Sequence, residues 1–347
     1  MRFYQRDLEE IGLIRKERII SAINHKETDI VPYYIGYTPP IEKFLQQHFK
    51  NKDVDESIGN HLLIVKGKTI RPMYADPKIY GDYSRDEFGV IWKNSPYDRG
   101  HVYKYPLTEL NLKNYEFPDL RNPGRFDHVH QILKTRKDVF SLGWIGELWE
   151  RCYFMMEFHK LVRALYTKLD FVEELLDRLM EYNLDIIEEL GRFPLNGVLL
   201  SDDYGHQKGL QMNPNTWRKL IKPRLKRIFD YAKKYGFYTF LHSDGDITSI
   251  LPDLIEIGLD VINPVQPEAM NPYEVKNQYG DKLCLWGALG TQKLLNQGTP
   301  EDIIIEVNHA KKELGHNGGY ILGPAINLQK DVPPENILTL INQAKGK

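Results

Sequence analysis

Short apolar runs alternate with longer amphipathic stretches from about Lys137 to the end of the chain. This alternation indicates β-strands that are each followed by an α-helix, the order from which a parallel sheet is built. An earlier apolar run fits the same scheme. The predicted strands cover residues 29–35, 138–144, 196–201, 237–242, 260–264, 283–287 and 319–323. The pattern therefore predicts successive strand–helix units around one sheet.

The predicted helices begin at residues suited to a first helical turn. Asn213 precedes Pro214 at one start, and Thr299 precedes Pro300 at another. Asn and Thr side chains accept hydrogen bonds from the free N–H groups of a first turn, where Pro is tolerated because it has no N–H. The longest pattern covers residues 171–190, with apolar positions near helical spacing. We predict that it is an outer helix packed on the sheet.

Residues 60–125 interrupt the alternation and are rich in Tyr, Asp, Pro and Gly. The runs at residues 86–92 and 101–107 resemble two strands of a hairpin. We predict one domain over residues 1–347, a closed (β/α)8 TIM-type barrel, with a hairpin-rich N-terminal insertion or cap at about 60–125. An open doubly wound sheet is the alternative, but no GxGxxG motif follows a predicted strand, so a dinucleotide-binding fold loses its main support.

Composition narrows the range of partners. The 347 residues include 46 Lys and Arg and 48 Asp and Glu, and a formal charge of −2 offers no basic surface for nucleic acid. Cys152 and Cys284 lie far apart in sequence, which excludes a disulfide scaffold and favours reduced thiols. The amino-terminal residues are charged throughout, and no run approaches the roughly 20 apolar residues of a membrane helix. We expect a cytoplasmic protein without nucleic-acid or membrane partners.

Ionisable residues stand at the ends of predicted strands, which in a barrel converge on one face. His242 ends one strand, and Asp244 follows at a spacing that can direct both side chains toward one metal ion or one proton. Asp202 and Asp203 follow another strand, and we expect one to point into the barrel mouth while the other caps the next segment. Two buried carboxylates would raise each other's pKa and provide a general acid near neutral pH. The alternative for His242 is a structural role, hydrogen-bonded to a neighbouring strand.

Further candidates lie near the same strand ends. Glu147 precedes an aromatic-rich helix start and could supply a carboxylate, although large aromatic side chains are more often part of a core. We expect the remaining candidates to bind the substrate or to support the groups that do. They are Asp202, Trp149, Tyr153, His206, Gln207, Gln266 and Asn327.

Several long stretches resemble the uroporphyrinogen decarboxylase superfamily, most closely its corrinoid-dependent methyltransferases. They are RKERIISAINHKETDIVP, DEFGVIW, LSDDYGHQKGLQMNPNTWRKLIKPRLKRI, HSDGDITSILPDLIEIGLDVINPVQPEAM, WGALGTQKLLNQGTPEDI and GGYILGPAINLQKDVPPENI. The resemblance spans nearly the whole chain and implies a (β/α)8 barrel with its site at the carboxyl-end mouth. Porphyrin-making decarboxylases have an early arginine-rich segment that binds substrate carboxylates, but this chain has PYYIGYTPP at residues 32–40. A tetrapyrrole polycarboxylate is therefore not the expected substrate.

The zinc-containing methyltransferases differ from this chain at their metal ligands. They have His-x-Cys at the strand end and a further Cys or His after the last strand, where this chain has His242, Asp244 and Ile326. Isoleucine cannot ligate zinc, so a thiolate-rich zinc site that activates a thiol acceptor is not expected. A zinc site built from Glu147, His242 and Asp244 stays open as a hypothesis.

The resemblance instead implies the other half-reaction, in which a methyl group passes from a small methoxylated or methylated-amine donor to a corrinoid held by a partner protein. His242 and Asp244 would form the acid or ligand pair, Asp203 and Glu147 would assist, and aromatic residues around Trp149 would form the donor pocket. One alternative is a decarboxylase that acts on a uroporphyrinogen-like or smaller carboxylic acid. Another is a degenerate barrel that only binds a small ligand, as the missing metal ligand at position 326 suggests.

Overall fold

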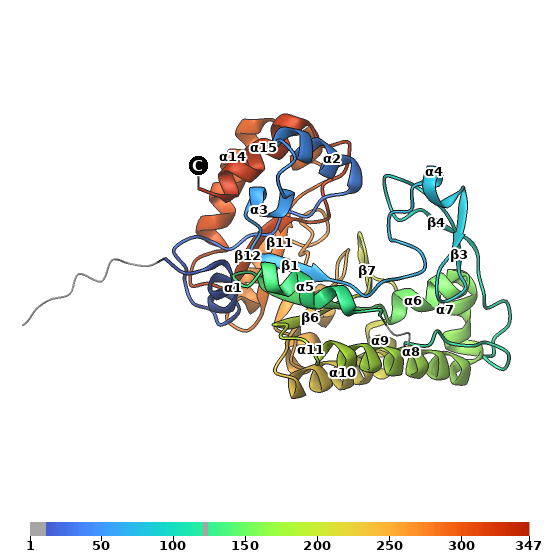
Figure 1. Cartoon of the computed structure of the whole chain (residues 1–347). Coiled ribbons are helices and arrows are strands. Elements are labelled where there is room, and N and C mark those ends of the chain that lie inside the picture. Colours follow the sequence, from blue (N-terminus) through green and yellow to red (C-terminus); the bar gives the residue numbers. More distant parts are fainter. Residues whose placement is uncertain (1–11, 121–123, 347) are drawn as a thin grey trace, which may run out of the picture.

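Seven parallel strands form one curled sheet in the computed structural model, which describes residues 12–120 and 124–346 (Figure 1). Parts of the predicted amino-terminal segment and of the predicted insertion lie outside these residues. The strands follow one another in space as they do in sequence. They are β1 (Leu62–Val65), β5 (Phe140–Gly146), β6 (Gly197–Ser201), β9 (Tyr238–His242), β10 (Val261–Asn263), β11 (Cys284–Leu289) and β12 (Tyr320–Pro324). Six of them overlap predicted strands, and the TIM-barrel-like fold is confirmed.

An extended segment at residues 32–37 occupies the eighth position, between β12 and β1. Tyr33 forms a single parallel bridge with Leu322 of β12. On the other edge, the N–H and carbonyl of Ile35 are hydrogen-bonded to the side chain of Asn60, at 2.8 and 3.2 Å. The prediction of a regular strand here is wrong, because two isolated bridges, the second between Tyr37 and Leu328, and the side chain of Asn60 replace most of the backbone ladder.

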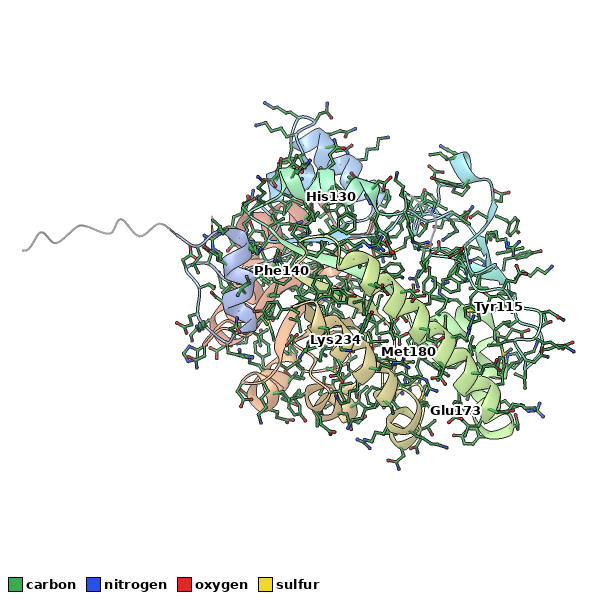
Figure 2. All side chains as sticks on the ribbon, turned by 60° about the horizontal axis from the view of Figure 1, so that its bottom comes forward. Tyr115, His130, Phe140, Glu173, Met180 and Lys234 are labelled. Atoms are coloured by element: carbon green, nitrogen blue, oxygen red, sulfur yellow. The ribbon has the colours of Figure 1, made fainter. Side chains whose placement is uncertain are left out.

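The interior of the barrel is filled by apolar side chains near the amino-terminal ends of the strands. They include Leu62, Phe140, Leu142, Leu199, Phe240, Val261, Cys284, Trp286 and Ile321. Ile19, Ala22 and Ile23 of α1 (Arg15–Ile23) belong to the same cluster, and Phe140 lies beside this helix in Figure 2. The amphipathic helix α1 therefore closes the amino-terminal end of the barrel. Access for a ligand is left at the carboxyl-terminal end.

Helices cover the outer face of the sheet. They are α5 (Asp127–Thr135), α6 (Trp149–Met155), α7 (Phe158–Thr167), α8 (Leu169–Leu190), α9 (Pro214–Leu220), α10 (Lys222–Lys234), η1 (Thr248–Ile250), α11 (Leu251–Glu256), α12 (Pro272–Tyr279), α13 (Leu294–Gln297), α14 (Pro300–Glu313) and α15 (Pro334–Ala344). The predicted long outer helix is α8, which runs beside α10 in Figure 2, where Met180 and Lys234 mark the two helices. Asn213 and Thr299 cap α9 and α14 as predicted. Within the described chain, every helix is too short or too polar to cross a bilayer.

The chain between β1 and β5 forms a separate antiparallel sheet of three strands. Its elements are α4 (Pro77–Tyr80), β2 (Tyr83–Arg85), β3 (Ile91–Lys93) and β4 (His101–Lys104), while α2 (Pro39–His48) and α3 (Val54–Ile58) precede β1. We call residues 70–107 the cap. Figure 1 shows its sheet apart from the barrel sheet and near α6 and α7. A small hairpin of β7 (Gly205–His206) and β8 (Gly209–Leu210) follows β6.

Candidate active site

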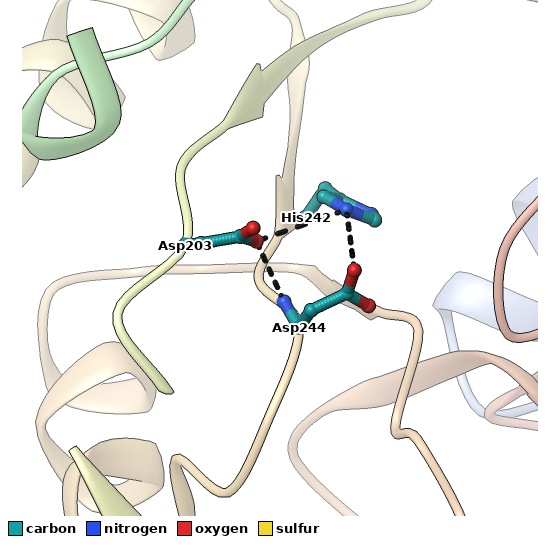
Figure 3. Close-up of side chains that lie close together, drawn as sticks. All are labelled: Asp203, His242 and Asp244. Atoms are coloured by element: carbon teal, nitrogen blue, oxygen red, sulfur yellow. Dashed lines mark hydrogen bonds and ion pairs between the residues drawn. The ribbon is translucent and has the colours of Figure 1, made fainter. Parts of the chain in front are cut away.

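Three ionisable side chains meet at the carboxyl-end mouth of the barrel (Figure 3). His242 is the last residue of β9, Asp244 follows it, and Asp203 lies just beyond β6. The Nε2 atom of His242 lies 3.9 Å from an oxygen of Asp203 and 3.9 Å from an oxygen of Asp244. The backbone N–H of Asp244 donates to Asp203 Oδ1 at 2.8 Å, which ties the two strand ends together. We call Asp203, His242 and Asp244 the mouth cluster.

Two glycines allow the loops after β6 and β9 to approach closely enough to form the mouth cluster. A Cβ atom at Gly205 would lie 2.7 Å from the carbonyl oxygen of Asp244, nearer than side-chain carbons normally come. A Cβ atom at Gly245 would lie 2.5 Å from the carbonyl carbon of Gly205, and Gly245 has a φ of +83°, which favours glycine. Larger residues at either position would separate the two loops. The glycines therefore help to hold the two aspartates together.

Asn263 determines which nitrogen of His242 carries a proton. It lies at the end of β10, in register with His242. Its Nδ2 donates to the carbonyl of Trp286 at 3.1 Å, so its Oδ1 faces Nδ1 of His242 at 2.6 Å. An acceptor at this position requires a proton on Nδ1. Nε2 consequently faces the two aspartates, with a lone pair when the ring is neutral and an N–H when it is protonated.

The mouth cluster favours a proton on His242. Burial by itself lowers the pKa of His242, but the charges of Asp244 and Asp203 and the hydrogen bond with Asn263 outweigh it and raise the pKa above its usual value. Burial raises the pKa of Asp244 to about 6, opposed by His242 and reinforced by Asp203. A proton held on Nε2 between two carboxylates is available for donation to a bound ligand.

The mouth cluster also fits a divalent cation. One ligand atom from each of its three residues lies within 4.8 Å of the others. Oδ1 of Asp244 is buried and has no hydrogen-bond partner among the described residues. One imidazole nitrogen and two carboxylate oxygens form a donor set that zinc and similar ions accept. The predicted ligand set contained Glu147, but the structure brings Asp203 to His242 and Asp244 in its place.

Glu147 is held instead in a buried network of ion pairs beside the mouth. Its carboxylate accepts hydrogen bonds from Arg99 at 3.0 Å and from Arg151 at 2.8 Å. Arg151 also pairs with Asp86 of the cap at 3.0 Å. Burial alone would raise the pKa of Glu147, but the two guanidinium groups lower it below its usual value. A carboxylate shared by two arginines stays ionised and connects the barrel to the cap.

Asp202 and Asp203 have different positions, but the helix that Asp202 caps is the earlier α6 and not the next segment, as the sequence had suggested. The carboxylate of Asp202 accepts the backbone N–H groups of Trp149 at 2.9 Å and Glu150 at 2.5 Å. Asp202 thereby caps α6 from a neighbouring strand end, and burial raises its pKa to about 7. Asp203 is left as the carboxylate that lines the mouth.

Asp202→Ala should lower the free energy of unfolding by about 1–3 kcal/mol, because two buried N–H groups at the start of α6 lose their acceptor. Asp202→Asn should lose less, since an amide oxygen can still accept one of these bonds. Urea-induced unfolding followed by circular dichroism measures both changes. Asp281→Ala removes an exposed aspartate and serves as the control. Equal stability of Asp202→Ala and the wild type would contradict this capping role.

A cavity of about 360 Å³ opens at the mouth cluster. Asn327 and Ile326 line it together with the cluster. The aromatic side chains that line it are Tyr34, Tyr74, Trp144 and Trp286. The rings that bound this cavity are therefore these four, and not the aromatic residues around Trp149 that the sequence suggested.

The other predicted binding residues lie outside this cavity. Trp149 is fully buried, and its indole N–H donates to Gln211 at 3.0 Å. Tyr153 packs edge-on against Trp149. Gln266 accepts the N–H of Gly245 at 3.1 Å and so supports the loop after β9. His206 and Gln207 are exposed on the β7–β8 hairpin.

Three ionisable residues that line the cavity were not predicted from the sequence. Glu150 lies in the first turn of α6 and accepts a hydrogen bond from Arg99 at 2.9 Å. Burial raises the pKa of Glu150 well above its usual value. Arg99 comes from the cap, and Lys66 follows β1. The position of Glu150 at a helix start just after a predicted strand was the available signal for this residue, whereas Arg99 and Lys66 had none.

Sequence and structure comparisons relate this chain to known proteins. The family model described as Uroporphyrinogen decarboxylase (URO-D) matches residues 88–346. Uroporphyrinogen decarboxylase of Legionella pneumophila subsp. pneumophila strain Philadelphia 1 is 23% identical over 225 residues, which cover 62% of this chain but only 61% of that protein. Uroporphyrinogen decarboxylase of Wigglesworthia glossinidia brevipalpis is 21% identical over 256 residues, or 70% of this chain and 69% of that protein. Among solved structures, a methyltransferase from Methanosarcina mazei has a TM-score of 0.73 at 18% identity and covers 96% of this chain and 99% of that one.

Proposed function

Because this chain belongs to the uroporphyrinogen decarboxylase (URO-D) family, we propose that it is an enzyme of that family that transfers a methyl group at its barrel mouth. The donor is a small methoxylated compound or methylated amine, and the acceptor is the cobalt of a corrinoid held by a partner protein. The observation that carries this proposal is the orientation of His242, whose Nε2 faces Asp203 and Asp244 in an aromatic-lined cavity. The shared fold with a protein named a methyltransferase supports it.

The leaving group determines what the mouth cluster must do. When a methyl ether reacts, the methyl carbon bonds to cobalt through an electron pair of the metal, and the electron pair of the broken carbon–oxygen bond stays on oxygen. His242 donates the proton that this oxygen needs. Asp203 and Asp244 stabilise the protonated imidazole before transfer, and Asn263 keeps Nε2 directed at the donor. A protonated methylamine needs less help from the acid.

A divalent cation held by Asp203, His242 and Asp244 would supply Lewis-acid assistance to the leaving oxygen. The role of His242 as an acid and its role as a metal ligand exclude each other, because an Nε2 atom that ligates a metal cannot carry a proton. Metal content, measured on the active protein, therefore distinguishes them. One equivalent of tightly bound cation favours the ligand role, and full activity after chelation favours the acid role.

A donor screen against reduced cobalamin tests the proposed function. Methoxy-aromatic compounds and methylamines are incubated with the purified protein, and methylation of cobalt is followed by its change in absorption spectrum. We expect methylation with at least one methoxylated donor and no change when protein is omitted. Absence of methylation with every donor, in the presence of folded protein and of the cognate corrinoid protein, would contradict the proposal.

Decarboxylation of a smaller carboxylic acid is the second candidate. The curated relatives are named uroporphyrinogen decarboxylases, and Lys66 and Arg99 place positive charge in the cavity, where a carboxylate could bind. Release of carbon dioxide without any corrinoid, together with failure to methylate cobalamin, would select this function.

Asn263→Leu should lower kcat/KM at neutral pH by about 10- to 100-fold, the usual cost of removing a group that orients a catalytic histidine. The variant should also lose activity at a lower pH than the wild type. A proton on His242 is present below the pKa of the ring and is lost as pH rises through it, and Asn263 contributes to raising that pKa.

The test combines the pH profile of kcat/KM with an NMR titration of the His242 ring. Asn277→Leu replaces an exposed asparagine and should leave both unchanged. If Asn263→Leu titrates like the wild type, Asn263 does not control His242.

A further inference from the structure

A second cavity of about 280 Å³ lies between the barrel mouth and the cap. It shares four lining residues with the mouth cavity, namely Lys66, Met73, Arg99 and Trp144. Phe88 and Trp92 of the cap and Tyr182 of α8 add to its aromatic lining. A ligand bound at the mouth cluster can therefore extend into this space.

Positive charge is in excess in this second cavity. Four cationic side chains line it, Lys66, Arg71, Arg99 and Arg151, against three carboxylates, Asp86, Glu87 and Glu147. Every carboxylate already has an arginine partner. Arg99 and Arg151 pair with Glu147, Arg151 also pairs with Asp86, and Glu87 pairs with Arg125 at 2.7 Å. Arg71 and Lys66 form no ion pair within the described chain, although the charges of Asp86 and Glu147 act on them from farther away.

Arg71 is a buried guanidinium with one free edge. Its side chain is fixed, because Nε donates to Ser84 and Asn94 and Nη2 donates to the carbonyl of Arg99 at 2.7 Å. The residue is only 7% exposed, and its guanidinium lies 5.0 Å from the ring centre of Trp92. Nη1 forms no hydrogen bond, and the side chain no ion pair, with any residue of the described chain. A guanidinium stays charged at neutral pH, so a buried positive charge faces this cavity.

Lys66 provides a second cation at the junction of the two cavities. Its ammonium group lies 5.1 Å from the ring centre of Trp144 and has no carboxylate partner within the described chain. The surrounding protein and Arg99 lower the pKa of Lys66 to about 8. Most Lys66 side chains therefore carry a positive charge at neutral pH. Lys66 as a whole is exposed, so water stabilises its charge in the free protein, and this charge attracts an anionic ligand to the junction.

We propose that the second cavity binds the carboxylate of an aromatic methyl donor, with Arg71 and Lys66 as the anion-binding residues. The inference rests on the proposed function, since it places the methoxy end of the same molecule at the mouth cluster. Nη1 of Arg71 and Nζ of Lys66 offer donors for the two oxygens of a carboxylate. The rings of Phe88, Trp92 and Trp144 suit the flat apolar body of a methoxybenzoate.

Equilibrium binding without any corrinoid tests this inference. The full-length protein is titrated with para-methoxybenzoate and with its neutral counterpart para-methoxybenzamide, using calorimetry. The acid should bind at least tenfold more tightly than the amide. Lys66→Met and Arg71→Gln should each weaken binding of the acid by about 10- to 100-fold, as for loss of a hydrogen bond to a charged group, and leave the amide unchanged.

Two controls keep these outcomes interpretable. Arg85→Gln removes an exposed arginine from the same cap sheet and should leave both affinities unchanged. Lys66 makes no side-chain hydrogen bond to a described residue, so Lys66→Met tests the idea even if Arg71→Gln disturbs the cap. Equal affinity for acid and amide, or an unaltered affinity in Lys66→Met, would overturn the inference. Inorganic phosphate that competes as strongly as the acid would also overturn it, by identifying a site for simple anions.

Failure of this inference can be told apart from failure of the proposed function. Methylation of cobalamin by uncharged donors alone, with no preference for acids, would remove the carboxylate site and keep methyl transfer. Tight, Lys66-dependent binding of the acid without methylation would keep the site and remove methyl transfer.

Discussion

His242→Gln is expected to lower kcat/KM for methyl transfer from an ether by about 10²- to 10⁴-fold, the usual contribution of a general acid. Glutamine can still form a hydrogen bond at this position, but it cannot donate a proton at neutral pH. Asn263 holds Nδ1 of His242, so Nε2 is the ring nitrogen that faces the cavity and the one that can act as the proposed acid. Single-turnover methylation of reduced cobalamin measures the change directly.

The same variant should lose less activity with a methylated amine, because an amine leaves without the full assistance of an acid. This difference between donors separates an acid role from a purely structural one, which would lower both rates alike. His159→Gln changes a histidine whose side chain is 74% exposed and serves as the matched control. A His242→Gln enzyme with the wild-type rate for an ether would exclude His242 from the chemistry.

Glu147→Gln is expected to lower the free energy of unfolding by about 3–5 kcal/mol, the usual cost of removing one partner from a buried ion pair. The Glu147 side chain is only 2% exposed and lies between Arg99 and Arg151. Without the charge of Glu147, the guanidinium groups of the buried Arg151 and the half-buried Arg99 would repel each other with less compensation. Urea-induced unfolding monitored by tryptophan fluorescence measures this loss.

This prediction assigns Glu147 a different role from the catalytic one that the sequence suggested. Glu116→Gln, at an exposed position, should leave stability unchanged. A Glu147→Gln protein that unfolds like the wild type and yet transfers no methyl group would return Glu147 to the catalytic machinery.

Much of the barrel could be predicted because its strands are apolar runs with clear boundaries and helices follow them. Two elements could not. β1 has only four residues, Leu62–Val65, and stands at the start of an irregular stretch, so it lacks the length of a typical strand signal. The closing segment at residues 32–37 contains an apolar run, but it is held by two isolated bridges and the side chain of Asn60, which no local pattern encodes.

The mouth cluster could be anticipated because barrel topology brings strand ends together, and Asp203, His242 and Asp244 all stand at such ends. What the sequence could not give was the direction of each neighbouring side chain. Glu147 and Glu150 are three residues apart, yet only Glu150 lines the mouth cavity, because Glu147 is turned toward Arg151. The directions of these side chains depend on contacts between segments far apart in the chain.

The three-stranded excursion between β1 and β5 carries residues to which we assign donor binding, apart from those to which we assign proton transfer. Arg71 and Arg99 belong to the cap, whereas His242 and both aspartates of the mouth cluster belong to strand ends. Replacing residues 70–107 with the corresponding excursion of a relative should transplant that relative's choice of donor and leave the proton chemistry in place. Such a graft must keep the ion pairs that join the cap to the barrel, which are Arg99 with Glu147 and Glu150 and Asp86 with Arg151.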